Sequence, residues 1–380
     1  MDKKPIVLII ENSIGVTGAL KSITRTAHDL KDSFDFIFVI PRNSKGRSWI
    51  EAKGFLKIQE LPMVEISRRF TSLCLYFPRL IINSFRLKRI IDESGANVLH
   101  VNDLYNMLPV TVRLLGCRIP YICHIRFLPN RFPKWLLNFW FKVHSKYSLK
   151  MIAVSQSVVK MLPFNLKLEV IPNELPVEER YPTMIHSMEN KEILTFLYLS
   201  NFMKGKGQNF ALEAFAKIHY ELPQWKLKFV GSDFGLKKNK LFRDNLKLRA
   251  SELGIQEKVE WSGYTEDVEK EYKEADIVLN FSESESFSIT CLESLFFGRP
   301  LIATDCGGPA EIIDHEETGI LVPNKNVEAM ADAMSRMALN EKMRCEMGKM
   351  ARQVVLKKYS IEKTSLRLKD VYNYVIKYSK

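Results

Sequence analysis

The chain of 380 residues is long enough for two domains of ordinary size and too long for a small module held together by disulfides. Hydrophobic residues make up 46% and charged residues 26%, which is typical of a globular protein and excludes a disordered or fibrous one. The formal net charge is +12, from 56 basic and 44 acidic residues, and all of this excess lies in the first half.

The charge asymmetry predicts a polyanionic partner for the first half of the chain alone. Residues 1–180 hold 27 basic and 15 acidic residues, whereas residues 181–380 hold 29 of each. The candidate partners are nucleic acid, an anionic membrane surface and a phosphorylated substrate. No motif of a nucleic-acid-binding fold accompanies the charge, so we expect no nucleic acid.

The first residues, MDKKPIVLIIENS, predict a first strand that ends at Glu11. A signal peptide is not expected, because no cleavage site of small residues follows the apolar run. No apolar stretch approaches the ~18 residues that span a bilayer. We therefore expect a cytoplasmic protein, peripheral at the inner face of the cell membrane. The six cysteines have no spacing that suits zinc, and we expect them to be reduced core residues. We expect neither a metal nor a cofactor.

Short apolar runs alternate with helical patterns throughout the chain, for example the helical stretches Ala19–Leu30 and Asn106–Leu115. The strands expected in the first half are Ile6–Ile10, Phe36–Ile40, Val98–Val101, Tyr121–Ile125, Met151–Ser155 and Leu168–Ile171. Those expected in the second half are Leu194–Leu199, Leu227–Val230, Val259–Trp261, Ile277–Phe281, Leu301–Thr304 and Ile320–Val322. Such alternation, with strands apolar on both faces, is typical of parallel sheets covered by helices on both sides.

The segment from Pro172 to Tyr181 predicts the boundary between two α/β domains, because it combines prolines with an acidic run. We expect an N-terminal acceptor-binding domain over residues 1–175 and a C-terminal nucleotide-sugar-binding domain over 176–360. Residues 361–380 are expected to form a helix that packs back on the N-terminal domain. Ligands of parallel sheets bind at the carboxyl ends of strands, so the site is expected in the cleft between the domains.

Two carboxylates follow the predicted strand Ile277–Phe281. Glu285 lies in the loop after it, and Glu293 lies about two turns into the next helix. A carboxylate can accept two hydrogen bonds from a vicinal diol, so the pair suits a ligand rich in hydroxyls. The paired glycines in Asp305–Pro309 precede another helix, where backbone N–H groups and the helix dipole favour a diphosphate.

The run Glu-x7-Glu, G-R-P, T-D-x-G-G-x-x-E and T-G-x-L-V resembles the C-terminal signature of the family 4 retaining glycosyltransferases. That family has the GT-B fold, in which two Rossmann-like, doubly wound parallel-sheet domains face each other across a cleft. The resemblance extends over nearly the whole chain. It includes LSNFMKGKG at Leu199–Gly207, the turn Val230-Gly231, the P-N element within Val170–Asn173, LHVND at Leu99–Asp103 and the N-terminal glycine loop with Gly15 and Gly18.

The resemblance implies a role for each matching residue in holding a UDP- or GDP-linked sugar. Glu293 would bind the ribose, Glu285 a sugar hydroxyl or phosphate oxygen, and Lys206 the diphosphate. The other donor-binding positions would be Asn201, Gly231, Ser286, Phe287, Ser288 and Ile289. A fixed cation with N–H dipoles stabilises the departing nucleoside diphosphate without a metal. Three positions depart from the family pattern: Asn201 stands where arginine is frequent, and Ser286 and Ser288 replace glycines.

The strand Tyr121–Ile125 resembles the one whose end carries a functional histidine in that family. Spacing from Pro120 puts Arg126 at this place and His124 two residues earlier. Arg126 would contact the donor phosphates or the transferring sugar and replace the cation missing at Asn201. The alternative for His124 is an ordinary strand histidine whose hydrogen bonds are satisfied.

Two basic and aromatic segments, Glu65–Ile91 and Arg126–Lys150, account for much of the charge in the first half. They suit contact with an anionic membrane. They also suit ordinary packed helices whose basic side chains reach solvent. We expect a metal-independent retaining glycosyltransferase that acts on a lipid-linked saccharide in the assembly of capsule, exopolysaccharide or O-antigen. The alternatives are a non-catalytic binding or scaffold subunit and a nucleotide-sugar epimerase on the same fold.

Overall fold

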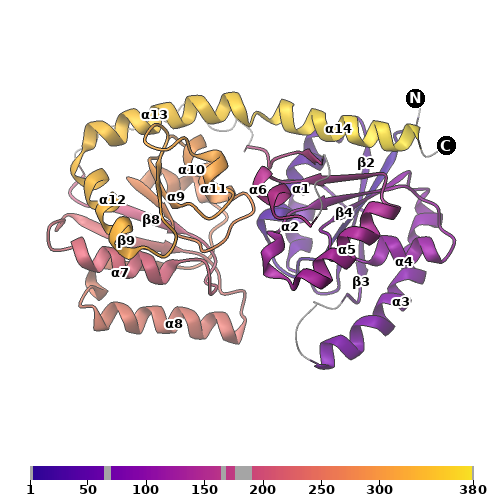
Figure 1. The fold of residues 1–380 in the computed structure, drawn as a ribbon, viewed down its shortest axis with the longest axis horizontal. Helices are drawn as coiled ribbons and strands as arrows, with labels where there is room; N and C mark the ends of the chain where they lie inside the picture. The colour runs from indigo at the N-terminus through magenta and orange to yellow at the C-terminus, as the bar shows by residue number, and fades with distance from the viewer. Residues whose placement is uncertain (1–2, 64–69, 164–167, 176–190, 379–380) are drawn as a thin grey trace. The chain divides into compact units, whose positions relative to one another are not determined.

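The computed structural model describes residues 3–63, 70–163, 168–175 and 191–378 (Figure 1). It divides into an N-terminal unit, Met1–Glu174 with Ile361–Lys380, and a C-terminal unit, Leu175–Ser360. Part of the predicted boundary segment Pro172–Tyr181 lies outside the described residues, and so does the start of the basic segment Glu65–Ile91.

The N-terminal unit is built on a sheet of seven parallel strands in the order β3-β2-β1-β4-β5-β6-β7. The strands are β1 (Ile6–Glu11), β2 (Asp35–Pro41), β3 (Ile58–Leu61), β4 (Val98–Asn102), β5 (Tyr121–Ile125), β6 (Lys150–Ala153) and β7 (Glu169–Val170). Strand β3 is missing from the sequence prediction, because two of its four residues are polar and only Leu61 is buried. It pairs with β2 alone, and an edge strand needs no apolar run.

Helices cover both faces of this sheet. They are α1 (Gly18–Asp29), α2 (Gly46–Ala52), α3 (Phe70–Ser94), α4 (Leu108–Leu114), α5 (Lys134–Tyr147), α6 (Gln156–Lys160) and α14 (Ile361–Lys377). From β1 to β3, each new strand adds to one side of β1 in the sheet. From β4 to β7, each new strand adds to the other side. Because parallel crossovers are right-handed, α1 and α2 lie on one face and α3 to α6 on the other.

The last helix, α14, completes the first of these faces. Its residues Leu368, Val371, Tyr372 and Val375 are buried in one hydrophobic cluster with side chains of α1, β1 and β4. The N-terminal unit is therefore made from two stretches of the chain, one before and one after the C-terminal unit.

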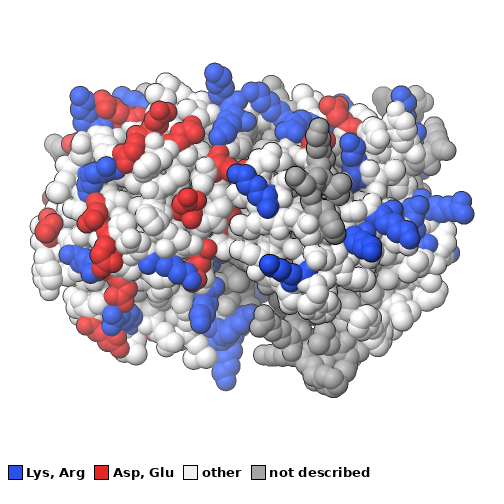
Figure 2. Space-filling model, in the orientation of Figure 1, with Lys and Arg blue, Asp and Glu red and all other residues white. Residues whose placement is uncertain are grey.

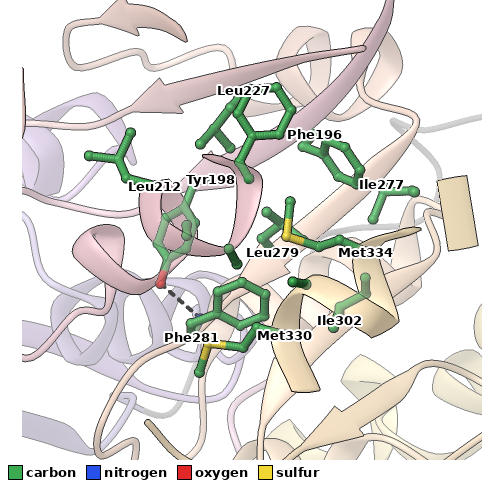
Figure 3. Close-up of a cluster of buried hydrophobic side chains, with 14 of the residues drawn as sticks. Phe196, Tyr198, Leu212, Leu227, Ile277, Leu279, Phe281, Ile302, Met330 and Met334 are labelled. Atoms are coloured by element: carbon green, nitrogen blue, oxygen red, sulfur yellow. Dashed lines mark hydrogen bonds between the residues drawn. The ribbon is translucent and has the colours of Figure 1, made fainter. Parts of the chain in front are cut away.

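The C-terminal unit has a sheet of six parallel strands in the order β10-β9-β8-β11-β12-β13. The strands are β8 (Leu194–Leu199), β9 (Trp225–Val230), β10 (Val259–Ser262), β11 (Ile277–Asn280), β12 (Leu301–Thr304) and β13 (Ile320–Val322). The helices are α7 (Gln208–Ile218), α8 (Lys237–Glu252), α9 (Val268–Glu274), α10 (Ile289–Phe296), α11 (Pro309–Ile312), α12 (Val327–Leu339) and α13 (Glu341–Lys358). Figure 3 shows its core, where strand residues such as Phe196 and Leu279 pack against Met330 and Met334 of α12.

Both sheets reverse their direction of winding once, and these points predict where ligands bind. In the C-terminal unit the reversal separates β8 from β11, and in the N-terminal unit it separates β1 from β4. Open parallel sheets bind ligands beyond the carboxyl ends of the strands at such a point. The two units confirm the predicted class of doubly wound parallel-sheet domains. Within the described ranges, no helix is both long and apolar enough to cross a membrane.

Candidate functional site

Lys206 and Glu285 meet at the reversal point of the C-terminal sheet. Lys206 lies in the loop after β8, and its Nζ is 2.6 Å from Oε1 of Glu285 in the loop after β11. Ser282 Oγ donates to the same carboxylate oxygen across 2.8 Å. The side chains of Lys206 and Glu285 are 27% and 14% exposed, so both are largely enclosed yet still reach solvent. The structure thus brings together two residues that are 79 positions apart and were selected from sequence.

The loop that carries Lys206 is held by close backbone contact. Gly207 has a φ of 79°, and a Cβ placed on it would lie 1.9 Å from the carbonyl oxygen of Phe281. Tyr198 Oη donates to the carbonyl of Lys206 across 2.5 Å and accepts from the N–H of Phe281 across 2.8 Å, the second of which is drawn in Figure 3. Sequence reasoning missed Tyr198, because in β8 it resembles any apolar strand residue.

Two helices begin beside the Lys206–Glu285 pair. Helix α7 begins at Gln208, directly after Gly207, and α10 begins at Ile289, four residues after Glu285. Unpaired N–H groups give a helix N-terminus a partial positive charge. Together with the ammonium group of Lys206, they make this edge of the sheet suitable for a diphosphate.

The segment Ser286–Ile289 adopts a strained conformation at one residue. Ser288 has φ 75° and ψ 93°, a region that glycine reaches far more easily than a residue with a Cβ. Its Oγ accepts from Asn280 Nδ2 across 2.9 Å and from the N–H of Cys291 across 3.3 Å, so the hydroxyl caps α10. The predicted departure from glycine therefore falls where the backbone has positive φ.

The paired glycines of Asp305–Pro309 pack against this segment. A Cβ on Gly308 would lie 2.3 Å from the Cα of Phe287, and the Gly308 N–H donates to the Glu285 carbonyl across 2.8 Å. Phe287 is buried against the ring of Tyr359. The glycine turn thus supports the backbone of the Glu285 loop.

The remaining donor-binding candidates lie close by in the same unit. Glu293 is buried on α10, and Tyr272 Oη donates to its Oε2 across 3.4 Å. Asn201 accepts from the N–H of Ser232 through its side-chain oxygen across 3.1 Å, which links the loops after β8 and β9. A Cβ on Gly231 would lie 2.0 Å from the carbonyl oxygen of Ser200, so these loops touch along their backbones.

Arg126 lies in a buried polar cluster at the carboxyl ends of β1, β4 and β5. Its Nε donates to Asn102 Oδ1, and its Nη1 donates to Asn173 Oδ1 across 2.7 Å. Asn102 in turn donates to Glu11. Burial lowers the pKa of Arg126, and the carboxylates of Asp103 and Glu11 oppose that shift. Its predicted contact with the donor stays a prediction.

Asp103 is a further candidate, which the sequence analysis includes in the LHVND motif but gives no role. Its φ is 112°, and its Oδ1 accepts from the N–H of Arg126 across 2.7 Å. Burial raises the pKa of this carboxyl to about 7. The signal in the sequence is a run of polar residues, Asn102 and Asp103, directly after a buried strand.

His124 lies inside the N-terminal unit beneath α14. Its ring stacks on His100, with centroids 5.5 Å apart, and His100 Nδ1 is 2.6 Å from Tyr372 Oη of α14. Burial, with Arg126 nearby, holds the pKa of His124 well below its ordinary value, so the ring is neutral. The packing favours the alternative of a strand histidine, but neither ring nitrogen of His124 has a hydrogen-bond partner within the described part of the chain.

The N-terminal glycine loop connects β1 to α1. Gly18 is the first residue of α1, and Thr17 caps the helix by accepting from the N–H of Leu20 across 3.3 Å. Gly15 is buried, two residues before this cap. The loop lies at the reversal point of its own sheet, next to Glu11.

Comparison with known proteins finds two families whose sequence models match neighbouring parts of this chain. Residues 185–354 match Glycosyl transferases group 1, and residues 37–178 match Glycosyltransferase Family 4. N-acetyl-alpha-D-glucosaminyl L-malate synthase from Bacillus anthracis is 31% identical over 189 residues, which are 50% of this chain and 47% of that protein. An uncharacterized glycosyltransferase of Haemophilus influenzae is 29% identical over 177 residues, 46% of this chain and 47% of that protein.

The chain thus spans about half the length of these curated relatives. Among solved structures, Anabaena Alr3699/HepE in complex with UDP and glucose has a TM-score of 0.80 at 15% identity. That alignment covers 97% of this chain and 99% of the other, and it shows a common fold, GT-B. The two family matches together span most of the chain, and its fold agrees with them. The chain therefore belongs to the glycosyltransferases of family 4, also described as glycosyl transferases group 1.

Proposed function

We propose that this protein is a retaining glycosyltransferase that moves a sugar from a nucleotide sugar to a hydroxyl of a lipid-linked saccharide, without a metal ion. The observation that carries the proposal is the Lys206–Glu285 pair, placed between the N-termini of α7 and α10 at the reversal point of the C-terminal sheet. A cation and two helix N-termini at one edge suit a diphosphate better than a neutral ligand.

The proposed reaction breaks the bond between the sugar C1 and the phosphate oxygen and forms a bond from C1 to the acceptor oxygen on the same face. The acceptor proton passes to an oxygen of the departing phosphate. Negative charge develops on the diphosphate as the first bond breaks, and the ammonium group of Lys206 stabilises it there. Glu285 holds Lys206 in place and accepts a hydrogen bond from a sugar hydroxyl.

A UDP-linked donor is the first candidate, ahead of a GDP-linked one. The support comes from a relative of the same fold, Anabaena Alr3699/HepE, whose solved structures include complexes with UDP and with UDP-glucose. Glu293 would bind the ribose, and the segment Ser286–Ile289 would surround the phosphates. Ser288 has a positive φ, so the segment keeps a backbone conformation that glycine favours although serine replaces the glycine of the family pattern.

The acceptor is proposed to be a lipid-linked saccharide in the assembly of a cell-surface polysaccharide, with the protein at the cytoplasmic face of the membrane. The excess of basic residues in residues 1–180 supports an anionic surface as partner of the N-terminal unit. Arg126, with Asp103 beside it, is proposed to lie where donor and acceptor react.

The test is a thermal-shift screen of nucleoside diphosphates and nucleotide sugars, followed by an assay of donor turnover. A ligand that binds only the folded protein raises the melting temperature with its concentration. We expect a uridine or guanosine nucleotide sugar to raise it and to be hydrolysed slowly in the absence of acceptor, with no loss of activity in EDTA. Binding without any turnover would support a scaffold subunit instead, and a sugar inverted within an intact nucleotide sugar would support an epimerase.

A further inference from the structure

The helix layer α3–α5 of the N-terminal unit exposes an unusual number of large apolar side chains. Eight residues of this layer are between 48% and 71% exposed. They are Leu75, Phe77, Ile81, Ile82 and Phe85 on α3, Leu114 at the end of α4, and Trp135 and Phe139 on α5. We call these residues the α3–α5 face. The helices belong to one layer, because right-handed crossovers place them on the same side of the sheet and α4 packs against both α3 and α5.

Helix α3 is apolar on its outer side while it buries polar residues. Asn83 is 3% exposed and donates to the carbonyl of Pro62 across 3.2 Å. Ser84 is 1% exposed, and its hydroxyl is 2.5 Å from that of Thr111 on α4. The neighbouring Ile82 and Phe85 point outward. An ordinary surface helix has the reverse arrangement, so the fold of this unit alone does not explain the apolar side chains on the outside of α3.

The α3–α5 face is also free of negative charge over most of its length. No aspartate or glutamate occurs between Glu65 and Asp92, or between Asp103 and Glu169. Basic residues that accompany the apolar ones on α3 and α5 are Arg79, Arg86, Lys134 and Lys142. None of these four has a carboxylate partner among the residues that the structure describes. On the side shown in Figure 2, acidic side chains gather over the C-terminal unit and are sparse over the N-terminal unit.

We propose that the α3–α5 face docks on an anionic lipid bilayer. Its aromatic and aliphatic side chains enter the boundary between headgroups and acyl chains, and its arginines and lysines contact lipid phosphates. This inference deepens the proposed function and rests on it, because it assigns the membrane partner of that enzyme to defined residues. A second copy of the chain is a poorer occupant, since two faces with the same positive charge repel each other.

The test is co-sedimentation of the full chain with lipid vesicles, with no nucleotide sugar present. We expect binding to vesicles of phosphatidylglycerol and phosphatidylcholine, weaker binding to phosphatidylcholine alone, and a fall in binding as salt increases. The double variant Ile81→Gln with Phe85→Gln is expected to lower the partition coefficient about tenfold or more, because each side chain loses its apolar transfer free energy. Arg86→Gln with Lys142→Gln is expected to weaken binding to the vesicles that contain phosphatidylglycerol and to leave binding to phosphatidylcholine vesicles unchanged.

The matched control is Leu241→Gln with Leu248→Gln on α8 of the C-terminal unit. These two leucines are 53% and 61% exposed, similar to Ile81 and Phe85, and α8 is also basic, with six basic and two acidic residues. The control therefore tests whether any basic helix with exposed leucines would give the same result. Vesicle binding of this control should equal that of the wild type. The inference would be overturned if the control lost as much vesicle binding as Ile81→Gln with Phe85→Gln. It would also be overturned if the wild type did not bind the vesicles.

Two further measurements separate the other outcomes. If the wild type dimerises in sedimentation and Ile81→Gln with Phe85→Gln abolishes the dimer without any lipid binding, the face pairs two copies and the proposal is wrong. The thermal shift caused by a nucleotide sugar should be the same in all variants, since the changes lie outside the donor site. Vesicle binding without sugar transfer would contradict the proposed enzyme and leave the docking surface standing.

Discussion

Lys206 and Glu285 form an ion pair that is enclosed enough to resist screening and open enough to receive a ligand. Lys206 Nζ and the hydroxyl of Ser282 both donate to Oε1 of Glu285, so the carboxylate is held from two loop positions. The spacing of Glu285 from Glu293 and the resemblance of Leu199–Gly207 to the family pattern point to these two residues. They meet because the loops after neighbouring strands of a parallel sheet come together at one edge. Tyr198, which fixes the loop of Lys206, could not be found that way, since its role depends on a contact with Phe281 in another loop.

Replacing Lys206 tests whether its charge stabilises a departing diphosphate. Lys206→Ala is expected to lower kcat/KM for the donor by about 10²–10³, the usual effect of removing one group that stabilises developing charge. Lys204→Ala is the matched control, because Lys204 lies in the same loop and is exposed. Steady-state turnover of the donor is the measurement. Similar activity in both variants would remove Lys206 from the catalytic site.

Ser288 is a residue whose backbone conformation and hydroxyl act in opposite directions on stability. The positive φ costs about 1–3 kcal/mol in a residue with a Cβ, and the hydroxyl cap contributes about 1 kcal/mol. Sequence predicted the departure from glycine here, but only the structure shows that the backbone keeps the conformation that glycine favours.

Two substitutions separate the strain at Ser288 from its cap. Ser288→Ala keeps the strain and loses the hydrogen bonds to Asn280 and Cys291, so we expect it to be less stable than the wild type by about 1–2 kcal/mol. Ser288→Gly loses the same bonds but relieves the strain, and it should exceed Ser288→Ala in stability by about 1 kcal/mol. Urea unfolding measures both. Equal stabilities of the two variants would show that the backbone here is not strained.

At the scale of elements, a buried carboxyl group joins α14 to α1. It belongs to Glu174, where the first stretch of the N-terminal unit ends. Glu174, the last residue of that stretch, accepts from Thr26 of α1 across 2.6 Å and from Ser365 of α14 across 2.7 Å. Burial, with Asp29 nearby, raises the pKa of Glu174 from 4.5 to about 8. A group whose pKa is raised in the folded state stabilises that state at low pH and loses this effect as the pH rises.

The stability of the N-terminal unit should therefore fall as the pH rises from about 4.5 to about 8, where the folded protein binds a proton that the unfolded chain has lost. In the wild type, the free energy of unfolding should fall by on the order of 2–4 kcal/mol over this pH range. Glu174→Gln has a neutral side chain at every pH, so it should lack this fall and be more stable than the wild type near pH 8. Thermal unfolding across this range measures it. Glu93→Gln, an exposed glutamate paired with Arg89, should retain the wild-type slope.

Elements with a simple burial pattern were predictable, and those with mixed burial were not. Strand β1 is buried throughout and was found from its apolar run, whereas β3 was missed because it is an edge strand with polar residues. Helix α3 was expected as an amphipathic segment. Its outward apolar face could not be read from the pattern, because periodicity does not say which side of a helix faces the sheet.

For the whole molecule, sequence predicted two doubly wound parallel-sheet domains and the uneven distribution of charge between them. Alternation of strands and helices is a local property, so it survives in a single sequence. The buried cluster of Glu11, Asn102 and Arg126 is different, because it joins residues up to 115 positions apart. Only the order of strands in the sheet shows that these residues share one edge.

The place of α14 has a consequence for the order in which the protein folds during synthesis. The N-terminal unit needs Leu368, Val371, Tyr372 and Val375 for its core, and these leave the ribosome only after the whole C-terminal unit. The C-terminal unit ends at Ser360, so its chain is complete earlier. Although domains generally fold in the order of their synthesis, here the unit that starts first finishes last. Until then the surface that α14 covers remains open to chaperones.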